Sequence, residues 1–293
     1  MKFALLLLAI LAAPAAAEEE FPTKGNVEIT VTSTAGTSAD ISARVLAEGM
    51  TKQLGVAVTV VNRPGGGVVG YKYVASRKPD GYAMVWHSNV ISTAFYAGQL
   101  PFDYRAFDPV ARVLVESPML AVRSDAKWKT LGELIADAKA HPGAITIANS
   151  GAGGHTHLAS AALFSAAGVP VSDVPYGAAQ VMPNLLGGHV DAAMQLPSVV
   201  IPHVKSGAIR VIAHSTLEAW RGIAVPKGTP IGIVAILEYA IRRTVETPEF
   251  QRSCEKYAMR PAFQPSAEFG EFIARDDAEI ARLMQAIGLK KPS

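Results

Sequence analysis

Strand-like and helix-like segments alternate along most of this chain of 293 residues. The run NVEITVTS at 26–33 has the β-branched alternation of a strand, and SADISARVLAEGMTKQLG at 38–55 repeats apolar residues at helical spacing before Gly55. Parallel strands need crossover connections, and crossover helices cover both faces of a sheet. The alternation therefore predicts an α/β protein with mixed, mostly parallel sheets.

The same patterns continue to the end of the chain. Further strands are predicted at 56–62, 82–88, twice within 107–124 around Ser117-Pro118, and at 144–150, 171–176, 189–196 and 208–215. Further helices are predicted at 71–77, 131–140, 155–168, 178–188, and in an amphipathic tail over 230–260 and 266–287. Thr130 and Glu133 form a capping box before the helix at 131–140.

The first twenty residues predict export. Lys2 precedes an apolar run over 3–13, and Ala15 and Ala17 form a small-x-small cleavage site before Glu18. The apolar run is shorter than the roughly 20 residues of a membrane-spanning helix. We therefore expect a signal peptide over 1–17, cleaved after Ala17, and a free periplasmic protein.

Composition narrows the class of partner. The formal net charge is only +2, which gives no electrostatic footprint for nucleic acid or a membrane surface. Cys254 is the one cysteine, so the chain has no disulfide framework. With 49% apolar residues and this length, two lobes are expected rather than one.

Several catalytic and cofactor interpretations are weak. Gly65, Gly67 and Gly70 spell G-x-G-x-x-G, but Arg63-Pro64 separates them from the strand and no acid follows at the spacing of a dinucleotide site. His155 and His157 point to different faces of a helix, so they cannot chelate a metal together. The chain has no G-x-S-x-G elbow for a nucleophilic serine. We expect a binding protein without a cofactor or metal, and not an enzyme.

Two loops suggest an anion site. The segments TSTAGTSAD at 32–40 and NSGAGGHT at 149–156 combine hydroxyls, glycines and small residues at the start of a helix. Free N–H groups at a helix N-terminus attract carboxylates, and Ser or Thr hydroxyls add donors. Ligands of open α/β sheets lie beyond the carboxyl ends of the strands. The pattern fits two interpretations equally well. The loops could be ordinary N-caps, or they could bind the two ends of a dicarboxylate.

Five motifs occur in the order of a known family. They are GTSADISAR, VVNRPGGGVVGYKYVASRKPDGYAMVW, LPFDYRAFDPVARV, NSGAGGHTHLASAALFSAAGV and VPYGAAQVMPNLLGGHVDAAM. In this order they resemble the substrate-binding proteins of tripartite tricarboxylate transporters, the Bug family, from about residue 26 to 290. The glycine cluster then corresponds to a structural turn of that family.

The resemblance implies a two-lobed clamshell similar to type II periplasmic binding proteins. Lobe 1 would comprise 18–122 and 223–293, and lobe 2 would comprise 123–222. A small di- or tricarboxylate or aromatic acid would bind between the lobes, and the closed monomer would dock on the membrane permease subunits. The alternative is a periplasmic sensor that presents the bound acid to a signalling receptor.

The resemblance also implies the residues that bind the ligand. They are Ser33, Thr34, Gly36, Thr37, Asp40, Ser88, Asn89, Ser150, Gly153, His157, Tyr176, Gly177, Ala178 and Gln195, with Ser198 following the strand that ends near 196. None of these loops contains an arginine, so main-chain N–H groups, hydroxyls and ordered waters are expected to carry recognition.

The chain departs from the family pattern at four places. Thr37 replaces the second glycine of the family's first loop. Ser33 stands where a bulky residue is frequent, and VPYGAA lacks the usual Lys or Arg after Tyr176. At Thr216-Leu217 the family usually has a longer segment before a Trp-x-Gly like that at 220–222.

Overall fold

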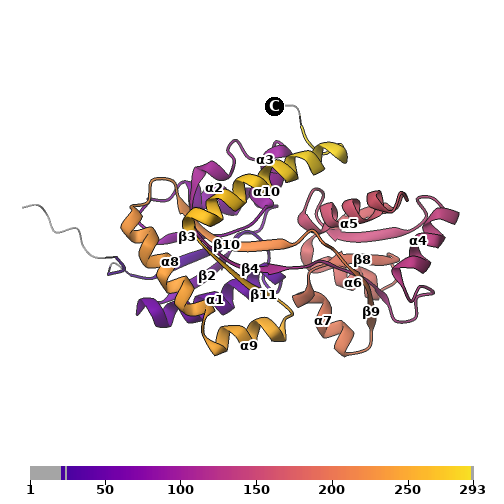
Figure 1. The fold of residues 1–293 in the computed structure, drawn as a ribbon, viewed down its shortest axis with the longest axis horizontal. Coiled ribbons are helices and arrows are strands. Elements are labelled where there is room, and N and C mark those ends of the chain that lie inside the picture. Colours follow the sequence, from indigo (N-terminus) through magenta and orange to yellow (C-terminus); the bar gives the residue numbers. More distant parts are fainter. Residues whose placement is uncertain (1–20, 24, 292–293) are drawn as a thin grey trace, which may run out of the picture.

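A computed structural model of the chain describes residues 21–23 and 25–291. The predicted signal peptide and its cleavage site lie outside these residues. Figure 1 shows two lobes side by side, each built around its own β-sheet. Among the described residues, no helix is both long and apolar enough to cross a membrane.

The first lobe contains a six-stranded sheet in the order β11-β4-β10-β3-β1-β2. Its strands are β1 (Val27–Val31), β2 (Val58–Asn62), β3 (Ala83–His87), β4 (Phe107–Glu116), β10 (Ala219–Pro226) and β11 (Arg260–Pro265). Strands β2, β1 and β3 are parallel, whereas β10 runs antiparallel to both β3 and β4.

Helices cover both faces of this sheet (Figure 1). They are α1 (Ser38–Leu54), α2 (Val68–Ala75), α3 (Val90–Tyr96), α8 (Ile231–Val245), α9 (Pro248–Lys256) and α10 (Ser266–Ala286), with the 3-10 turn η1 (Tyr104–Ala106). Buried apolar residues of α1, α8 and α9 pack against one face, and those of α2 and α3 against the other. Such two-sided burial explains why β3 is apolar on both faces.

The second lobe contains a five-stranded sheet in the order β7-β6-β8-β5-β9. Its strands are β5 (Met119–Arg123), β6 (Thr146–Ser150), β7 (Ser172–Tyr176), β8 (Ala192–Gln195) and β9 (Ile209–His214). Its helices are α4 (Leu131–Ala140), α5 (His155–Ala166), η2 (Ala178–Gln180), α6 (Val181–Leu186) and α7 (Pro197–Lys205). Two apolar clusters flank the sheet, so this lobe has a core of its own.

The chain passes between the sheets twice. It leaves the first sheet at the end of β4 and enters the second at β5, and it returns from β9 to β10. The two crossings therefore lie at 117–118 and 215–218, slightly before each of the lobe boundaries expected from the sequence. Because β4 and β5, and β9 and β10, are joined so tightly, the two sheets meet end to end.

The predicted fold class is confirmed, and most predicted elements are present. Helix α1 ends at Gly55 in the left-handed conformation, and Thr130 caps α4 by accepting a hydrogen bond from the Glu133 N–H. The helical tail expected over 230–260 is largely present but is not one helix. It divides into α8 and α9 at Pro248, since proline is favoured in a first turn and cannot continue a helix, and Arg260 begins strand β11. Strand β10 was not predicted.

Gly222 of β10 tests how tightly helix α10 packs on the first sheet. A Cβ atom at this position would lie 2.4 Å from Cζ of Phe269 and 2.5 Å from the main-chain oxygen of Ala111. We predict that Gly222→Ala lowers the free energy of unfolding by about 1–3 kcal/mol through overpacking. Urea titration followed by circular dichroism measures this change.

The matched control is Gly232→Ala in α8, where an added Cβ meets no atom within 4 Å. Alanine in a helix is favoured over glycine by roughly 0.5–1 kcal/mol, so this variant should be at least as stable as the wild type. Equal stability of Gly222→Ala and the wild type would contradict the packing described for β10.

Candidate ligand-binding site between the lobes

The carboxyl ends of the parallel strands of both sheets face each other. In the first lobe, β1, β2 and β3 end at 31, 62 and 87, and in the second lobe β6, β7 and β8 end at 150, 176 and 195. Parallel strands present their following loops at one edge of a sheet. The predicted binding loops of each lobe are therefore neighbours within that lobe, and the two groups lie on facing edges.

The loop after β1 is held by its own hydroxyls and by the Asn62 side chain of β2. Asn62 Nδ2 donates to the Ser33 carbonyl (3.1 Å), and Thr37 Oγ1 donates to the Thr34 carbonyl (2.8 Å). Since the single Thr37 hydroxyl hydrogen is used there, Ser33 Oγ donates to Thr37 Oγ1 (2.8 Å). Thr34 and the neighbouring Gly36 remain exposed to solvent.

Asp40 shapes this loop from the first turn of α1. Its carboxylate accepts hydrogen bonds from the Gly36 N–H (2.9 Å) and from Arg44 Nε (3.0 Å). Burial acts to raise the pKa of Asp40, but the hydrogen bonds from Arg44 and Gly36 outweigh it and hold the pKa below its ordinary value. Asp40 is therefore ionised and engaged within its own lobe.

The loops of the second lobe are joined by a similar network. Gln195 Nε2 donates to Ser150 Oγ (2.9 Å), and the Gly151 N–H donates to the Tyr176 carbonyl (2.9 Å). Gly154 precedes α5 at a position where a Cβ would lie 2.2 Å from the Ser150 carbonyl oxygen, so only glycine fits. These contacts hold three strand ends together, while Gly177 stays exposed and Ala178 begins η2.

The two histidines of α5 point to different partners, as predicted. His157 Nδ1 accepts a hydrogen bond from the Gly153 N–H (2.9 Å), and its Nε2 lies 3.8 Å from Asp173. His155 instead points toward the first lobe. His157 is thus engaged within the second lobe, and His155 contributes to the contact between lobes.

We define the interlobe interface by the side chains that join the two lobes: Ser38, Asn89 and Glu116 from the first lobe, and His155 and Ser198 from the second. All of them are buried. Asn89 was predicted from the sequence, and its neighbour Ser88 is buried beside it at the end of β3.

Glu116 lies at the centre of this interface, at the end of β4. Its carboxylate accepts one hydrogen bond from Ser38 Oγ and another from Ser198 Oγ (3.2 Å). Ser38 begins α1 of the first lobe, and Ser198 lies in the first turn of α7 of the second. The positive ends of two helix dipoles therefore meet one negative charge.

His155 forms a second link. Its Nε2–H donates to the Leu217 carbonyl in the return crossing (2.9 Å), which leaves Nδ1 to accept from Asn89 Nδ2. Burial, and to a lesser extent the charge of Arg221, lower the pKa of His155 to about 4, although the bond to Leu217 opposes this. The imidazole is therefore neutral near pH 7.

Arg221 of β10 is a further polar residue of this region that the sequence analysis missed. Its side chain is buried, and its Nη1 donates a hydrogen bond to the carbonyl of the preceding residue, Trp220 (3.0 Å). Its Nε has no hydrogen-bond partner, and neither has Asn89 Oδ1. The loops contain no arginine, but this strand supplies one. A charged residue in an otherwise apolar segment was the available signal for both Arg221 and Glu116.

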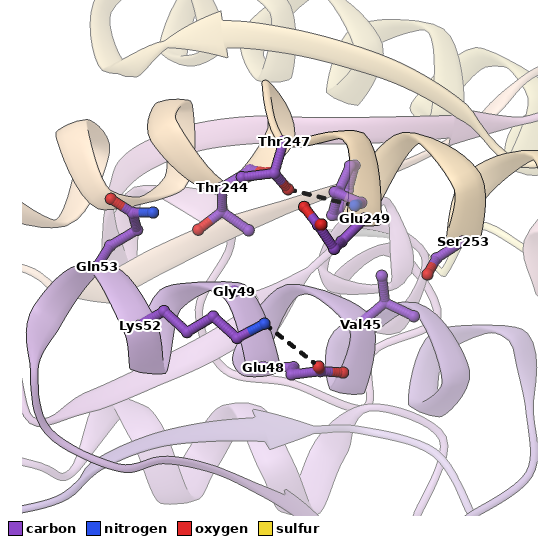
Figure 2. A pocket seen from close by; sticks show the side chains of 10 residues that line it. Val45, Glu48, Gly49, Lys52, Gln53, Thr244, Thr247, Glu249 and Ser253 are labelled. Carbon is purple, nitrogen blue, oxygen red and sulfur yellow. Dashed lines mark hydrogen bonds and ion pairs between the residues drawn. The ribbon is translucent and has the colours of Figure 1, made fainter.

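Two cavities lie elsewhere in the first lobe. One, of about 110 Å³, lies between α1 and the α8–α9 corner, where Lys52 pairs with Glu48 (3.6 Å) and Gly49 faces Thr244 (Figure 2). The other, of about 380 Å³, is lined by residues of η1, β4 and α10 and reaches His87. Neither is lined by the facing loops, so neither is the predicted site.

The comparisons with known proteins identify the class. The chain matches the model of the tripartite tricarboxylate transporter family receptor over residues 42–218. It is 30% identical to a Cupriavidus necator protein described as the UPF0065 protein in gbd 5'region, over 97% of this chain and 94% of that one. The chain therefore belongs to this receptor family, and it is a binding receptor rather than an enzyme.

Solved structures share the two-lobed fold. The TctC solute binding protein from Polaromonas is 30% identical, with a TM-score of 0.71 over 91% of this chain and 100% of that one. The periplasmic binding protein BugD is 27% identical, with a TM-score of 0.83 over 92% and 99% of the two chains. An R. palustris protein with adipate is 22% identical, with a TM-score of 0.85 over 92% and 99%.

The neutral His155 makes stability depend on pH. Between its ordinary pKa of 6.5 and its folded pKa of about 4, the unfolded chain binds a proton that the folded chain does not. Stability is therefore lost as pH falls from 6.5 toward 4, by up to about 3 kcal/mol from this group. Between pH 7 and pH 4.5 the free energy of unfolding should fall for both proteins. We predict that it falls by about 2 kcal/mol less in His155→Gln than in the wild type.

Urea unfolding experiments at the two pH values measure this difference. Protonation of all other groups affects both proteins equally, so its contribution cancels in the comparison. The exposed His189 provides the control variant His189→Gln, which should follow the wild type. Identical acid sensitivity of the wild type and His155→Gln would show that His155 is not held neutral at the interface.

Proposed function

We propose that this protein is a periplasmic solute receptor that binds a small carboxylate between its lobes and delivers it to the permease subunits of a tripartite tricarboxylate-type transporter. The hydrogen bonds that Glu116 accepts are the main support for this proposal. Ser38 and Ser198, from the first turns of helices in different lobes, donate to one carboxylate. These two hydroxyls are engaged by Glu116, and their arrangement supports the idea that helix N-termini from both lobes can meet at one carboxylate.

Relatives support the ligand class. An R. palustris protein of the same fold is described with adipate, and MatC from Rhodopseudomonas palustris with bound malate. Both ligands are small carboxylates with two acidic ends, which matches loops from two lobes that each offer hydroxyls and main-chain N–H groups. By analogy we propose the same class of ligand for this chain.

We also propose how the chain moves and where it acts. Residues 117–118 and 215–218 would be the hinge, because they alone join the two sheets. Closure about them would be a rigid-body hinge motion. The signal peptide over 1–17 would direct the chain to the periplasm, where it would act as a monomer.

Thr37 provides a test of the proposed site. It is buried at the start of α1, and its hydroxyl contacts both Ser33 and Thr34. Thr37→Leu removes these contacts and places a larger side chain at the facing edge. We predict at least tenfold weaker binding, about 1.4 kcal/mol, of the tightest acid found in a thermal-shift screen of aliphatic and aromatic carboxylates.

Isothermal titration calorimetry measures the two affinities. Thr59→Val, at an exposed position of β2, is the control and should bind as the wild type does. An unchanged affinity in Thr37→Leu would argue against this site, and a screen in which no acid raises the melting temperature would argue against the function.

A further inference from the structure

The cavity beneath helix α10 in the first lobe is not lined by the facing loops. Its volume of about 380 Å³ lies within the range of pockets that hold small molecules. Its buried lining includes His87, Phe107 and Ile273, and its exposed lining includes Arg105 and Lys227. The cavity therefore extends from the surface of the first lobe to the buried side chain at the end of β3.

His87 is the buried polar residue of this cavity. Its side chain is 1% exposed, and its Nδ1 has no hydrogen-bond partner in the described part of the chain. A buried polar atom without a partner costs free energy, so it favours a bound group that can form a hydrogen bond with it. The cavity borders this side chain, and a ligand held there can supply that group.

The surroundings of His87 favour a neutral partner. Burial lowers the pKa of His87 to about 3, so the imidazole is neutral near pH 7. Its ring lies with its centroid 5.5–6.4 Å from those of Tyr71, Phe107, Trp220 and Phe269. A neutral imidazole can donate one hydrogen bond and accept one, whereas a charged group among these rings would lose its hydration without an opposite charge.

The two cations that line the cavity do not require an anion either. Arg105 binds the Asp103 carboxylate, and Lys227 binds the Asp108 carboxylate. Both cationic side chains are largely exposed to water, where ion pairs contribute little and a further anion gains little. Each pair is neutral as a whole, so the outer end of the cavity accepts an uncharged molecule.

We propose that this cavity is a second binding site, for a small neutral molecule that carries an aromatic ring and one hydroxyl group, a phenol. The ring packs against Phe107, Pro109 and Ile273, which supply the apolar lining. The hydroxyl forms a hydrogen bond with His87, and either tautomer of His87 allows this because a phenol both donates and accepts. The site differs from the proposed carboxylate site in its place and in the charge of its ligand.

A matched pair of probes, 4-cresol and toluene, tests the proposal on the wild-type mature protein. The two molecules differ only by the hydroxyl group, and both are neutral at pH 7. Calorimetry measures each affinity. We expect 4-cresol to bind at least about tenfold more tightly than toluene, because only 4-cresol can form the hydrogen bond with His87.

Two variants assign the binding to this cavity. Gly270 lines it from α10, and a Cβ atom there would lie 3.3 Å from Cγ of Pro109. Gly270→Leu fills part of the cavity and should weaken binding of 4-cresol at least about tenfold. Gly232→Leu in α8, where an added Cβ meets no atom within 4 Å, is the control and should bind 4-cresol as the wild type does. His87→Phe removes both ring nitrogens and should abolish the preference for 4-cresol over toluene.

Thr37→Leu separates this inference from the proposed function. It changes the site between the lobes, so it should leave the affinity for 4-cresol unchanged. Binding of 4-cresol that is weakened by Thr37→Leu but not by Gly270→Leu would place the phenol between the lobes and overturn the inference. Failure of 4-cresol to bind, or equal affinities for 4-cresol and toluene, would also overturn it and leave the proposed function standing. If Gly270→Leu or His87→Phe does not fold, these two wild-type measurements still decide.

Discussion

The buried carboxylate of Glu116 links the two lobes of this protein through hydrogen bonds. Glu116 ends the strand that leaves the first sheet, and it accepts hydrogen bonds from the first turns of α1 and α7 in different lobes. Buried carboxylates are stable only where donors surround them, and here each lobe supplies one. This contact brings the two helix N-termini together at one carboxylate, at the edge where the loops of the two lobes face each other.

The two crossings between the lobes are short, and one of them takes part in the interlobe interface. The return crossing at 215–218 is where this chain lacks a longer segment typical of the resembling family, yet β9 and β10 both keep their places in complete sheets. Leu217 of this crossing accepts the bond from His155. The short connection therefore fixes the tautomer of His155, and through it the contact with Asn89.

Much of the fold was predictable because local periodicity determined it. The alternation of segments predicted the α/β class, and the loops at strand ends predicted which residues would gather at each edge. Strand β10 was missed because it is buried at every position and shows no alternation, while Gly222 and Arg221 interrupt its apolar pattern. Glu116 and Arg221 were missed for a related reason. Their proximity depends on an antiparallel pairing between residues far apart in sequence, which no local pattern contains.

We propose that the ligand binds where the two sheets meet end to end. A crystal structure of the mature protein with its tightest-binding acid tests this most directly. We expect ligand density between the lobes, in contact with residues from the loops after β1 or β3 and from the loops after β6 or β8. Density confined to one lobe, such as the cavity beneath α10 that reaches His87, would contradict it.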